Sequence, residues 1–300
     1  MSASLPSDQA APHTGFVPVR NAKLYYRELG QGLPIIVIHG GPDFDHTYLL
    51  PDMDRLSDSY RLIYYDQRGR GRSAEHVKPE DVTLQSDVED LESLRDYFQL
   101  GSAAVVGHSW GGLLALEYAL RYPQRVSHLI LMNSAPVSCA DYLLLRQDRR
   151  ATAPADLEEL KARSTEASYQ EGDPDAVAAY YRIHFRATLK QTEHLEKVIQ
   201  SLRASFTKEG IRKARAIEKR LMHETWWSNE YDLLPKLKRL NIPTLVIYAE
   251  YEFIPVECAL HIAKAIPGAR CVSLRKCGHF SYLECPDQVR REIDDFFANS

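Results

Sequence analysis

Apolar positions along this chain follow two alternating patterns. Short continuous apolar runs, at 34–38, 62–65 and 103–106, are typical of strands buried on both faces of a sheet, and further strands are expected at 126–132 and 244–248. Between several of them, apolar residues recur every three or four positions, which predicts amphipathic helices. Strands that alternate with helices pair in parallel and carry helices on both faces. We therefore predict an α/β fold with a mostly parallel sheet.

The two ends of this pattern differ from its middle. Residues 16–29 alternate enough to predict an antiparallel pair of opening strands. A last strand at 270–274 and a helix that begins at Pro286 close the fold. Residues 1–15 are polar and lack the apolar core of a signal peptide, so we expect a flexible lead-in.

The stretch 137–240 interrupts the alternation. It contains helical patterns at 157–163, 177–185, 195–202 and 211–221 but no convincing buried strand. We interpret it as a helical cap inserted into a core made of residues 16–136 and 241–300, lying over the strand ends.

Composition narrows the function classes. A hydrophobic content of 44% and a net charge of −4 describe an ordinary globular protein and give no electrostatic case for nucleic acid or an anionic membrane as a partner. No run approaches the roughly 18 apolar residues that a membrane span needs. The five cysteines are odd in number and lack metal-type spacing, so we expect a reduced, cytoplasmic setting and no metal or other cofactor. The oligomeric state stays open.

The sequence Gly107-His108-Ser109-Trp110-Gly111 lies between a predicted buried strand and a predicted helix. Gly-x-Ser-x-Gly in that context is the spacing of a nucleophile elbow, a strained turn that exposes the serine at the end of a strand. Residues two before and two after the serine must be small. We therefore predict Ser109 to be a nucleophile.

A serine needs a base to remove its proton, and that base is usually a histidine oriented by a carboxylate. In this fold the chain order is serine, acid, histidine. Of the eleven histidines, His279 alone follows the last predicted strand, and Gly278 lets its loop bend towards the elbow. His39 and His108 lie inside glycine turns, where we expect them to pack or hydrogen-bond locally.

The acid should lie in the loop after strand 244–248. Glu252 and Glu250 are the candidates, because no aspartate occurs there. We favour Glu252, which precedes the turn into the next helix, and keep Glu250 as the alternative. The oxyanion needs two backbone N–H donors. Trp110 can supply one, and Gly41 in His39-Gly40-Gly41-Pro42 can supply the other.

Three loops together carry a family resemblance: residues 39–42, residues 66–73 (DQRGRGRS) and residues 107–112 (GHSWGG). They resemble the proline iminopeptidase branch of the α/β-hydrolase family. The resemblance implies the same triad and oxyanion residues, and a helical cap that holds the amino end of the substrate. The chain departs from the family pattern in two places, with Asp43 where glycine is usual and Glu252 where aspartate is usual.

An aminopeptidase must neutralise a buried substrate ammonium with carboxylates. Asp43 would serve if it faces the pocket, and the cap offers several glutamates (Glu209, Glu218, Glu224, Glu230). Of these we single out Glu224, because it lies beside Trp226 and Trp227, which could form an apolar wall for a proline ring. A solvated helix face with core aromatic residues is the competing interpretation.

The sequence therefore predicts a cofactor-independent serine hydrolase that acts through an acyl-enzyme on a small molecule or short peptide with an N-terminal proline or a similar residue. A carboxylic ester or lactone hydrolase is the alternative, because the same triad serves both reactions. A non-catalytic small-ligand receptor on this fold is a further alternative, which retention of the serine, histidine and acid disfavours. Dehalogenase and epoxide hydrolase chemistry needs an aspartate nucleophile, whereas this chain has Ser109.

Overall fold

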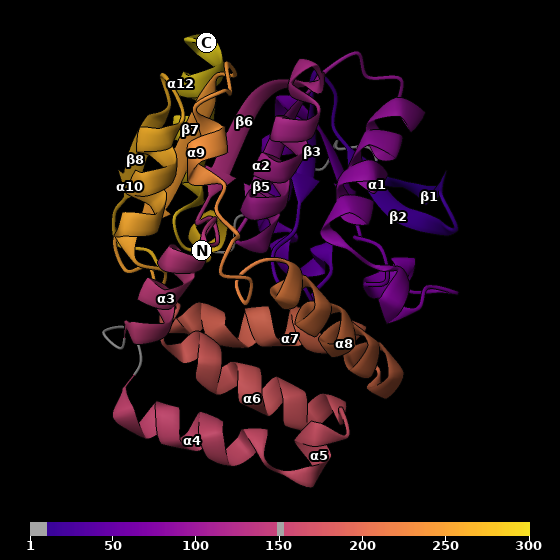
Figure 1. Ribbon diagram of the computed structural model, residues 1–300, viewed down its shortest axis with the longest axis vertical. Coiled ribbons are helices and arrows are strands. Elements are labelled where there is room, and N and C mark those ends of the chain that lie inside the picture. Colours follow the sequence, from indigo (N-terminus) through magenta and orange to yellow (C-terminus); the bar gives the residue numbers. More distant parts are fainter. Residues whose placement is uncertain (1–10, 149–152) are drawn as a thin grey trace.

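An eight-stranded sheet forms the centre of the molecule in the computed structural model, which describes residues 11–148 and 153–300 (Figure 1). The strand order is β1-β2-β4-β3-β5-β6-β7-β8. The strands are β1 (His13–Val19), β2 (Ala22–Leu29), β3 (Leu33–Ile38), β4 (Tyr60–Tyr65), β5 (Ala103–His108), β6 (Val126–Met132), β7 (Thr244–Ala249) and β8 (Arg270–Leu274). β1 and β2 are antiparallel, as expected, and β3 to β8 run parallel.

Helices cover both faces of the sheet and one of its ends (Figure 1). They are α1 (Leu84–Tyr97), α2 (Trp110–Arg121), α3 (Cys139–Gln147), α4 (Pro154–Ser164), α5 (Ala167–Gln170), α6 (Pro174–Arg186), α7 (Leu195–Ser205), α8 (Lys208–Glu224), α9 (Leu234–Leu237), α10 (Val256–Ala265), α11 (Ser281–Glu284) and α12 (Pro286–Ala298). In the described part of the chain, none of these helices has both the length and the apolarity needed to cross a bilayer.

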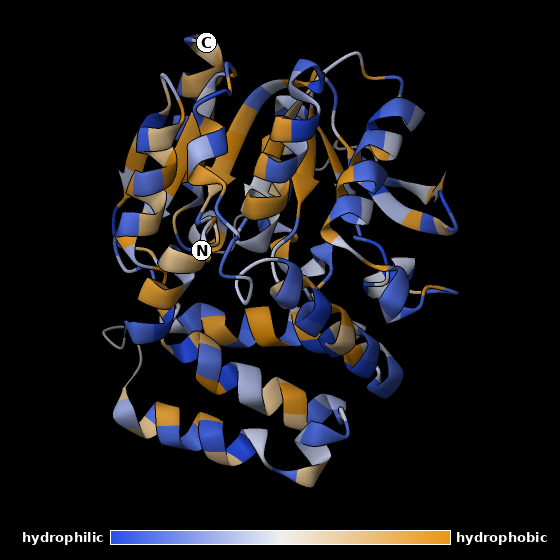
Figure 2. Cartoon of the chain, in the orientation of Figure 1, coloured by the Kyte–Doolittle hydropathy of each residue, from blue (hydrophilic) through white to orange (hydrophobic). Residues whose placement is uncertain are grey.

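Successive residues of the parallel strands point to opposite faces, and both faces are buried. On β3, Ile35 and Val37 belong to one apolar cluster, which also includes side chains of α12, whereas Ile36 and Ile38 belong to another, which includes side chains of α1, α2 and α10. Figure 2 shows the central strands as mostly apolar and the outer helices as alternately apolar and polar. This burial explains why the strands appear as uninterrupted apolar runs in the sequence.

All four helical patterns predicted between residues 137 and 240 fall on helices, namely α4, α6, α7 and α8. The chain leaves the core at Ser138 and returns at Asp232, where the two residues form an antiparallel bridge. The insertion therefore ends earlier than residue 240. Leu233, Leu237 and Leu240 are fully or almost fully buried among core side chains, so the segment that carries them belongs to the core.

The start of the fold also differs from the expectation. Residues 13–15 belong to β1, because they pair with residues 26–28 of β2. The expected lead-in is therefore shorter than 15 residues, and its first ten residues lie outside the described part of the chain.

The arginine-rich loop after β4 anchors helix α1. The guanidinium of Arg70 forms two hydrogen bonds with Asp87, at 3.0 and 2.9 Å, and both side chains are completely buried. Arg68 forms a similar bidentate pair with Asp90, which lies about one helical turn after Asp87. The loop residues 66–73, which carry part of the family resemblance, thus fix the strand end against α1, and Arg68 and Arg70 are structural.

Candidate active site

Ser109 lies on the turn between β5 and α2 with φ of 56° and ψ of −121°, outside the regions that non-glycine residues ordinarily adopt. The turn is possible because its neighbours are glycines. A Cβ on Gly107 would lie 2.2 Å from the carbonyl oxygen of Gly111, and a Cβ on Gly111 would lie 2.2 Å from that of Ile38. Ser109 is partly exposed, whereas His108 and Trp110 are buried. This is the geometry that the elbow motif predicts.

His279 follows β8 and forms a close pair with Glu252, which follows β7. Its Nδ1–H donates to Glu252 Oε1 at 2.9 Å, and each side chain is only 5% exposed. Because Nδ1 carries the proton, Nε2 of the neutral ring is the nitrogen left to accept a proton. His279 and Ser109 line the same cavity.

Glu252 is positioned by more than the histidine. Oε1 also accepts the backbone N–H groups of Phe253 and Ile254, and Oε2 accepts the side-chain amide of Asn133. The other candidate, Glu250, is exposed and accepts the backbone N–H of Lys276. The structure thus brings Glu252, and not Glu250, to His279.

Asn133 was missed by the sequence reasoning. It follows β6 directly, has φ of 49°, and is fixed from behind by the hydroxyl of Ser281, which donates to Asn133 Oδ1 at 2.6 Å. Its amide therefore points to Glu252. The available signal was its place at the carboxyl end of a parallel strand, where active-site residues of open α/β sheets gather.

Gly41 and Trp110 were predicted to supply the two oxyanion donors. Trp110 is the first residue of α2, so its N–H lies at the positive end of the helix. Gly41 has φ of 61°, and a Cβ there would lie 2.3 Å from the Phe44 ring. The N–H of the preceding Gly40 is not available, because it donates to the hydroxyl of Tyr48 at 2.6 Å.

The two histidines in the glycine turns hydrogen-bond locally, as expected. His108 donates from Nε2 to the carbonyl of His279 and accepts the Tyr48 hydroxyl at Nδ1. His39 donates from Nδ1 to the carbonyl of Gly40 and accepts the N–H of Gln67 at Nε2. Burial lowers the pKa of His39 to about 4 and lowers that of His108 well below its usual range. Both rings are therefore neutral supports of the site.

A cavity of about 930 Å³ lies between the core and the cap, and only some of the candidate site residues line it. Gly41, Ser109 and His279 line its floor. The cap contributes an apolar wall, which consists of Tyr142, Leu145, Leu157, Leu160, Met222 and Trp226. Asp43 also lines this cavity, which was the condition for its predicted role in substrate binding.

Glu224 and Trp227 do not reach this cavity, so their proposed role in substrate binding is not supported. The Glu224 carboxylate instead accepts the backbone N–H of Leu84 at the start of α1. Trp227 is 47% exposed and packs edge-on against His223. Of the paired tryptophans only Trp226 lines the site, with its indole N–H bonded to the carbonyl of Pro136.

Two carboxylates share the cavity wall. The Tyr181 hydroxyl donates to Asp43 Oδ2, and Glu218 of α8 lies near enough for the two acids to repel each other. Burial raises the pKa of Asp43, and burial together with the charge of Asp43 raises the pKa of Glu218 to about 8. Arg215 opposes both shifts with its positive charge. This pair holds a proton near neutral pH and would ionise fully beside a cation.

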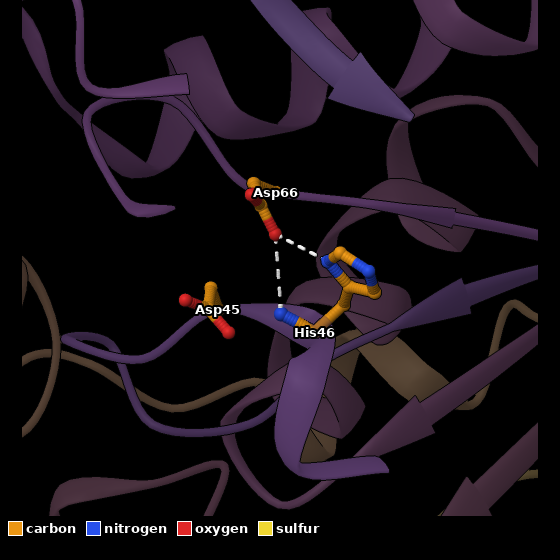
Figure 3. Close-up of side chains that lie close together, drawn as sticks. All are labelled: Asp45, His46 and Asp66. Atoms are coloured by element: carbon orange, nitrogen blue, oxygen red, sulfur yellow. Dashed lines mark hydrogen bonds and ion pairs between the residues drawn. The ribbon is translucent and has the colours of Figure 1, made fainter. Parts of the chain in front are cut away.

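A second group of ionisable side chains lies in the segments that follow β3 and β4. Figure 3 shows His46 and Asp66 facing each other, with Asp45 set apart from them. His46 donates to Asp66 Oδ1 from its ring and from its backbone, and the N–H of Arg72 donates to Oδ2. Asp45 accepts the N–H and hydroxyl of Thr47. These bonds tie the loop after β3 to the loop after β4, which is a structural role.

The family model described as alpha/beta hydrolase fold matches residues 34–286. The chain belongs to the α/β-hydrolase family. Curated relatives place it in the proline iminopeptidase-like branch. It is 28% identical to proline iminopeptidase of Saccharolobus solfataricus over 275 residues, which cover 90% of this chain and 86% of the relative. It is also 28% identical to proline iminopeptidase of Heyndrickxia coagulans, with 94% and 97% covered.

Solved structures of this α/β-hydrolase fold superpose over nearly the whole chain. Proline iminopeptidase of Mycobacterium smegmatis matches with a TM-score of 0.71 and 23% identity, covering 95% of this chain and 97% of that one. A thermophilic esterase from Thermogutta terrifontis matches with a TM-score of 0.69 and 24% identity, covering 96% and 98%. These matches establish the fold, and the sequence relatives establish that this α/β-hydrolase is a hydrolytic enzyme.

Proposed function

We propose that this α/β-hydrolase cleaves amide bonds that follow an N-terminal proline or a similar small residue, through an acyl-enzyme on Ser109. His279 Nε2 takes the Ser109 proton as Oγ attacks the carbonyl carbon, and the resulting tetrahedral oxyanion accepts the N–H groups of Gly41 and Trp110. The imidazolium then gives its proton to the leaving amine as the C–N bond breaks. Water, deprotonated by the same histidine, hydrolyses the ester and releases the acid.

Glu252 supports the charge that appears on His279 during each half of this reaction. Its carboxylate accepts the Nδ1–H and is itself fixed by two backbone N–H groups and the Asn133 amide. The imidazole is therefore held in one tautomer and orientation before substrate binds. Preorganisation of this kind costs no rearrangement at the moment of reaction.

The observation that carries the peptidase assignment is the carboxylate pair Asp43 and Glu218 in the same cavity as Ser109. With both acids ionised, and with Arg215 beside them, the group carries one net negative charge. A substrate ammonium would balance that charge and allow both acids to ionise, which offsets the cost of burying the cation. Trp226 and the neighbouring apolar residues would then contact the ring of an N-terminal proline.

The extensive apolar wall of the cap favours a second candidate, a carboxylic ester or lactone hydrolase. The cavity is much larger than a prolyl residue, and an acyl chain would pack against Leu145, Leu157 and Leu160. Such a substrate lacks an ammonium group and makes no use of Asp43 or Glu218. The two candidates therefore differ in whether these acids matter.

A matched set of chromogenic substrates separates the candidates. We expect hydrolysis of L-proline p-nitroanilide, at least 100-fold slower hydrolysis of its N-acetyl derivative, and a selective loss of prolyl activity in Asp43→Asn and Glu218→Gln. Hydrolysis of p-nitrophenyl butyrate should change by no more than about threefold in these variants. Glu230→Gln is the control, because Glu230 is exposed and does not line this cavity.

Three results would contradict the proposal. Ester or lactone hydrolysis without prolyl amide hydrolysis would exclude the peptidase and leave the serine hydrolase mechanism intact. Full activity of Ser109→Ala would exclude the mechanism itself. Ligand affinity without any turnover of these substrates would point to a receptor.

A further inference from the structure

The segment that carries the catalytic histidine lies between two buried cysteines. Cys277 precedes His279 by two residues, and Cys285 directly follows α11. Their sulfur atoms lie 2.6 Å apart, which is closer than an ordinary contact between two thiols, and both side chains belong to the core cluster under the cap. The described structure brings together no other pair among the five cysteines.

The backbone on both sides of this pair is already fixed. The N–H of Tyr251 donates to the carbonyl of Cys277, and the N–H of Cys285 donates to the carbonyl of Ser281. Between them, the Glu284 carboxylate accepts the N–H of Gly278. The two cysteines are therefore held in place by contacts that do not depend on the sulfurs, and a bond between them needs little backbone movement.

We propose that Cys277 and Cys285 are an oxidisable dithiol, whose disulfide closes a covalent ring around residues 278–284 and braces His279 in its working position. The solvent exposure of the two cysteines indicates which one reacts with the oxidant first. Cys285 is 8% exposed and Cys277 is completely buried, so a small oxidant reaches Cys285 first.

The reaction balances with a peroxide as the oxidant. The Cys285 thiolate attacks one peroxide oxygen and becomes a sulfenic acid, with release of hydroxide. The Cys277 sulfur then attacks the Cys285 sulfur, the S–O bond breaks, and water leaves. In total, two thiols and one hydrogen peroxide give one disulfide and two waters.

The brace acts on the position of His279 rather than on the chemistry. In the reduced enzyme, two hydrogen bonds already hold the backbone of His279. Its N–H donates to the carbonyl of Thr188, and its carbonyl accepts Nε2–H of His108. The oxidised enzyme should therefore keep its activity within about twofold. Its thermal inactivation should be slower, because a cross-link limits the opening of the loop that would separate His279 from Glu252.

Trypsin gives a direct test, since it cuts after Lys276 and Arg290 and leaves both cysteines in one peptide, residues 277–290. Full-length protein is treated with hydrogen peroxide or dithiothreitol, denatured, alkylated with iodoacetamide and digested. We expect two alkyl groups on this peptide from the reduced protein. From the oxidised protein we expect no alkyl group and a mass two hydrogens below that of the unalkylated dithiol peptide. Two alkyl groups after peroxide, or a bond from Cys277 to a different cysteine, would overturn the proposal.

The brace itself is tested by the half-life of activity at a fixed, inactivating temperature. Peroxide should lengthen it at least about threefold in the wild type and in Cys271→Ser, and should leave it unchanged in Cys285→Ser. The half-lives of the oxidised and reduced wild-type protein can be compared without any variant. The test therefore remains valid even if Cys285→Ser folds poorly. An unchanged wild-type half-life with the disulfide formed would overturn the bracing role.

Discussion

Replacement of Glu252 by glutamine tests the least expected member of the triad. The carboxylate receives four donors: the Nδ1–H of His279, the Asn133 amide, and the N–H groups of Phe253 and Ile254. A glutamine has one acceptor oxygen. If that oxygen stays with His279 and the two backbone donors, the new NH₂ group faces the NH₂ group of Asn133. If it turns towards Asn133, an N–H faces Nδ1–H and the histidine loses its working tautomer.

Either orientation removes the negative charge that stabilises the imidazolium. In serine proteases the corresponding aspartate-to-asparagine change lowers kcat by about 10⁴. We therefore expect Glu252→Gln to lose about 10³- to 10⁴-fold in kcat, equivalent to about 4 to 5.5 kcal/mol in the activation free energy. KM should change far less, because Glu252 is 5% exposed and faces the histidine.

Steady-state rates on the best chromogenic substrate provide the assay, and Glu250→Gln is the matched control. Glu250 is exposed and bonds only to the backbone of Lys276 in the described structure, so its variant should stay within twofold of the wild type. A Glu252→Gln enzyme within tenfold of the wild type would refute the assigned role. Equal losses in both variants would assign the orienting role to the two acids jointly.

Three further outcomes follow from the structure. Gly40→Ala should lower kcat at least 100-fold with an unchanged circular dichroism spectrum, because its Cβ would lie 2.7 Å from that of Ser109; activity within tenfold would contradict this. Arg70→Met should lower the free energy of unfolding in urea by about 3 to 5 kcal/mol, because it leaves the Asp87 carboxylate buried and unpaired; a loss below about 1 kcal/mol would contradict this. The pKa of Glu218 is raised to about 8, so this acid is protonated at lower pH and ionises as the pH rises. The ratio of kcat/KM for the prolyl amide to kcat/KM for the butyrate ester should therefore rise from pH 6 to 8 in the wild type and stay constant in Glu218→Gln. A constant ratio in the wild type would contradict the role of Glu218.

The strands of the core and the positions of Ser109, His279 and Glu252 could be predicted because each depends on local sequence. Buried parallel strands leave apolar runs, and the elbow needs glycine on both sides of Ser109, where any Cβ would collide with backbone atoms. The order of motifs along the chain then places His279 and Glu252 at neighbouring strand ends. Chain order and turn chemistry were sufficient for these residues.

The cap could not be resolved in the same way, because its specificity depends on which face of a helix meets the cavity. Glu218 and Glu224 lie six positions apart on α8, so at about 100° per residue they point in clearly different directions. Glu218 faces the cavity and Glu224 faces α1. A helical pattern indicates an apolar side, but it does not indicate which polar residue beside that side lines a cavity.

Asn133 and the true end of the cap were missed for a related reason. A single asparagine after a strand has no distinctive spacing, and its role depends on Glu252, which is 119 residues away. Leu233, Leu237 and Leu240 continue a helical apolar pattern, and only their contacts with the core show that they lie outside the cap. Long-range packing decided both points.

The formation of an acyl-enzyme on Ser109 is the most direct test of the proposed mechanism. Enzyme mixed with a p-nitrophenyl ester and quenched in acid within milliseconds is digested with trypsin, and the peptide of residues 96–121 is analysed by tandem mass spectrometry. We predict that the acyl group is on Ser109 and not on Ser102 of the same peptide, and that Ser109→Ala forms no adduct. An acyl group on another residue, or undiminished turnover by Ser109→Ala, would contradict the mechanism.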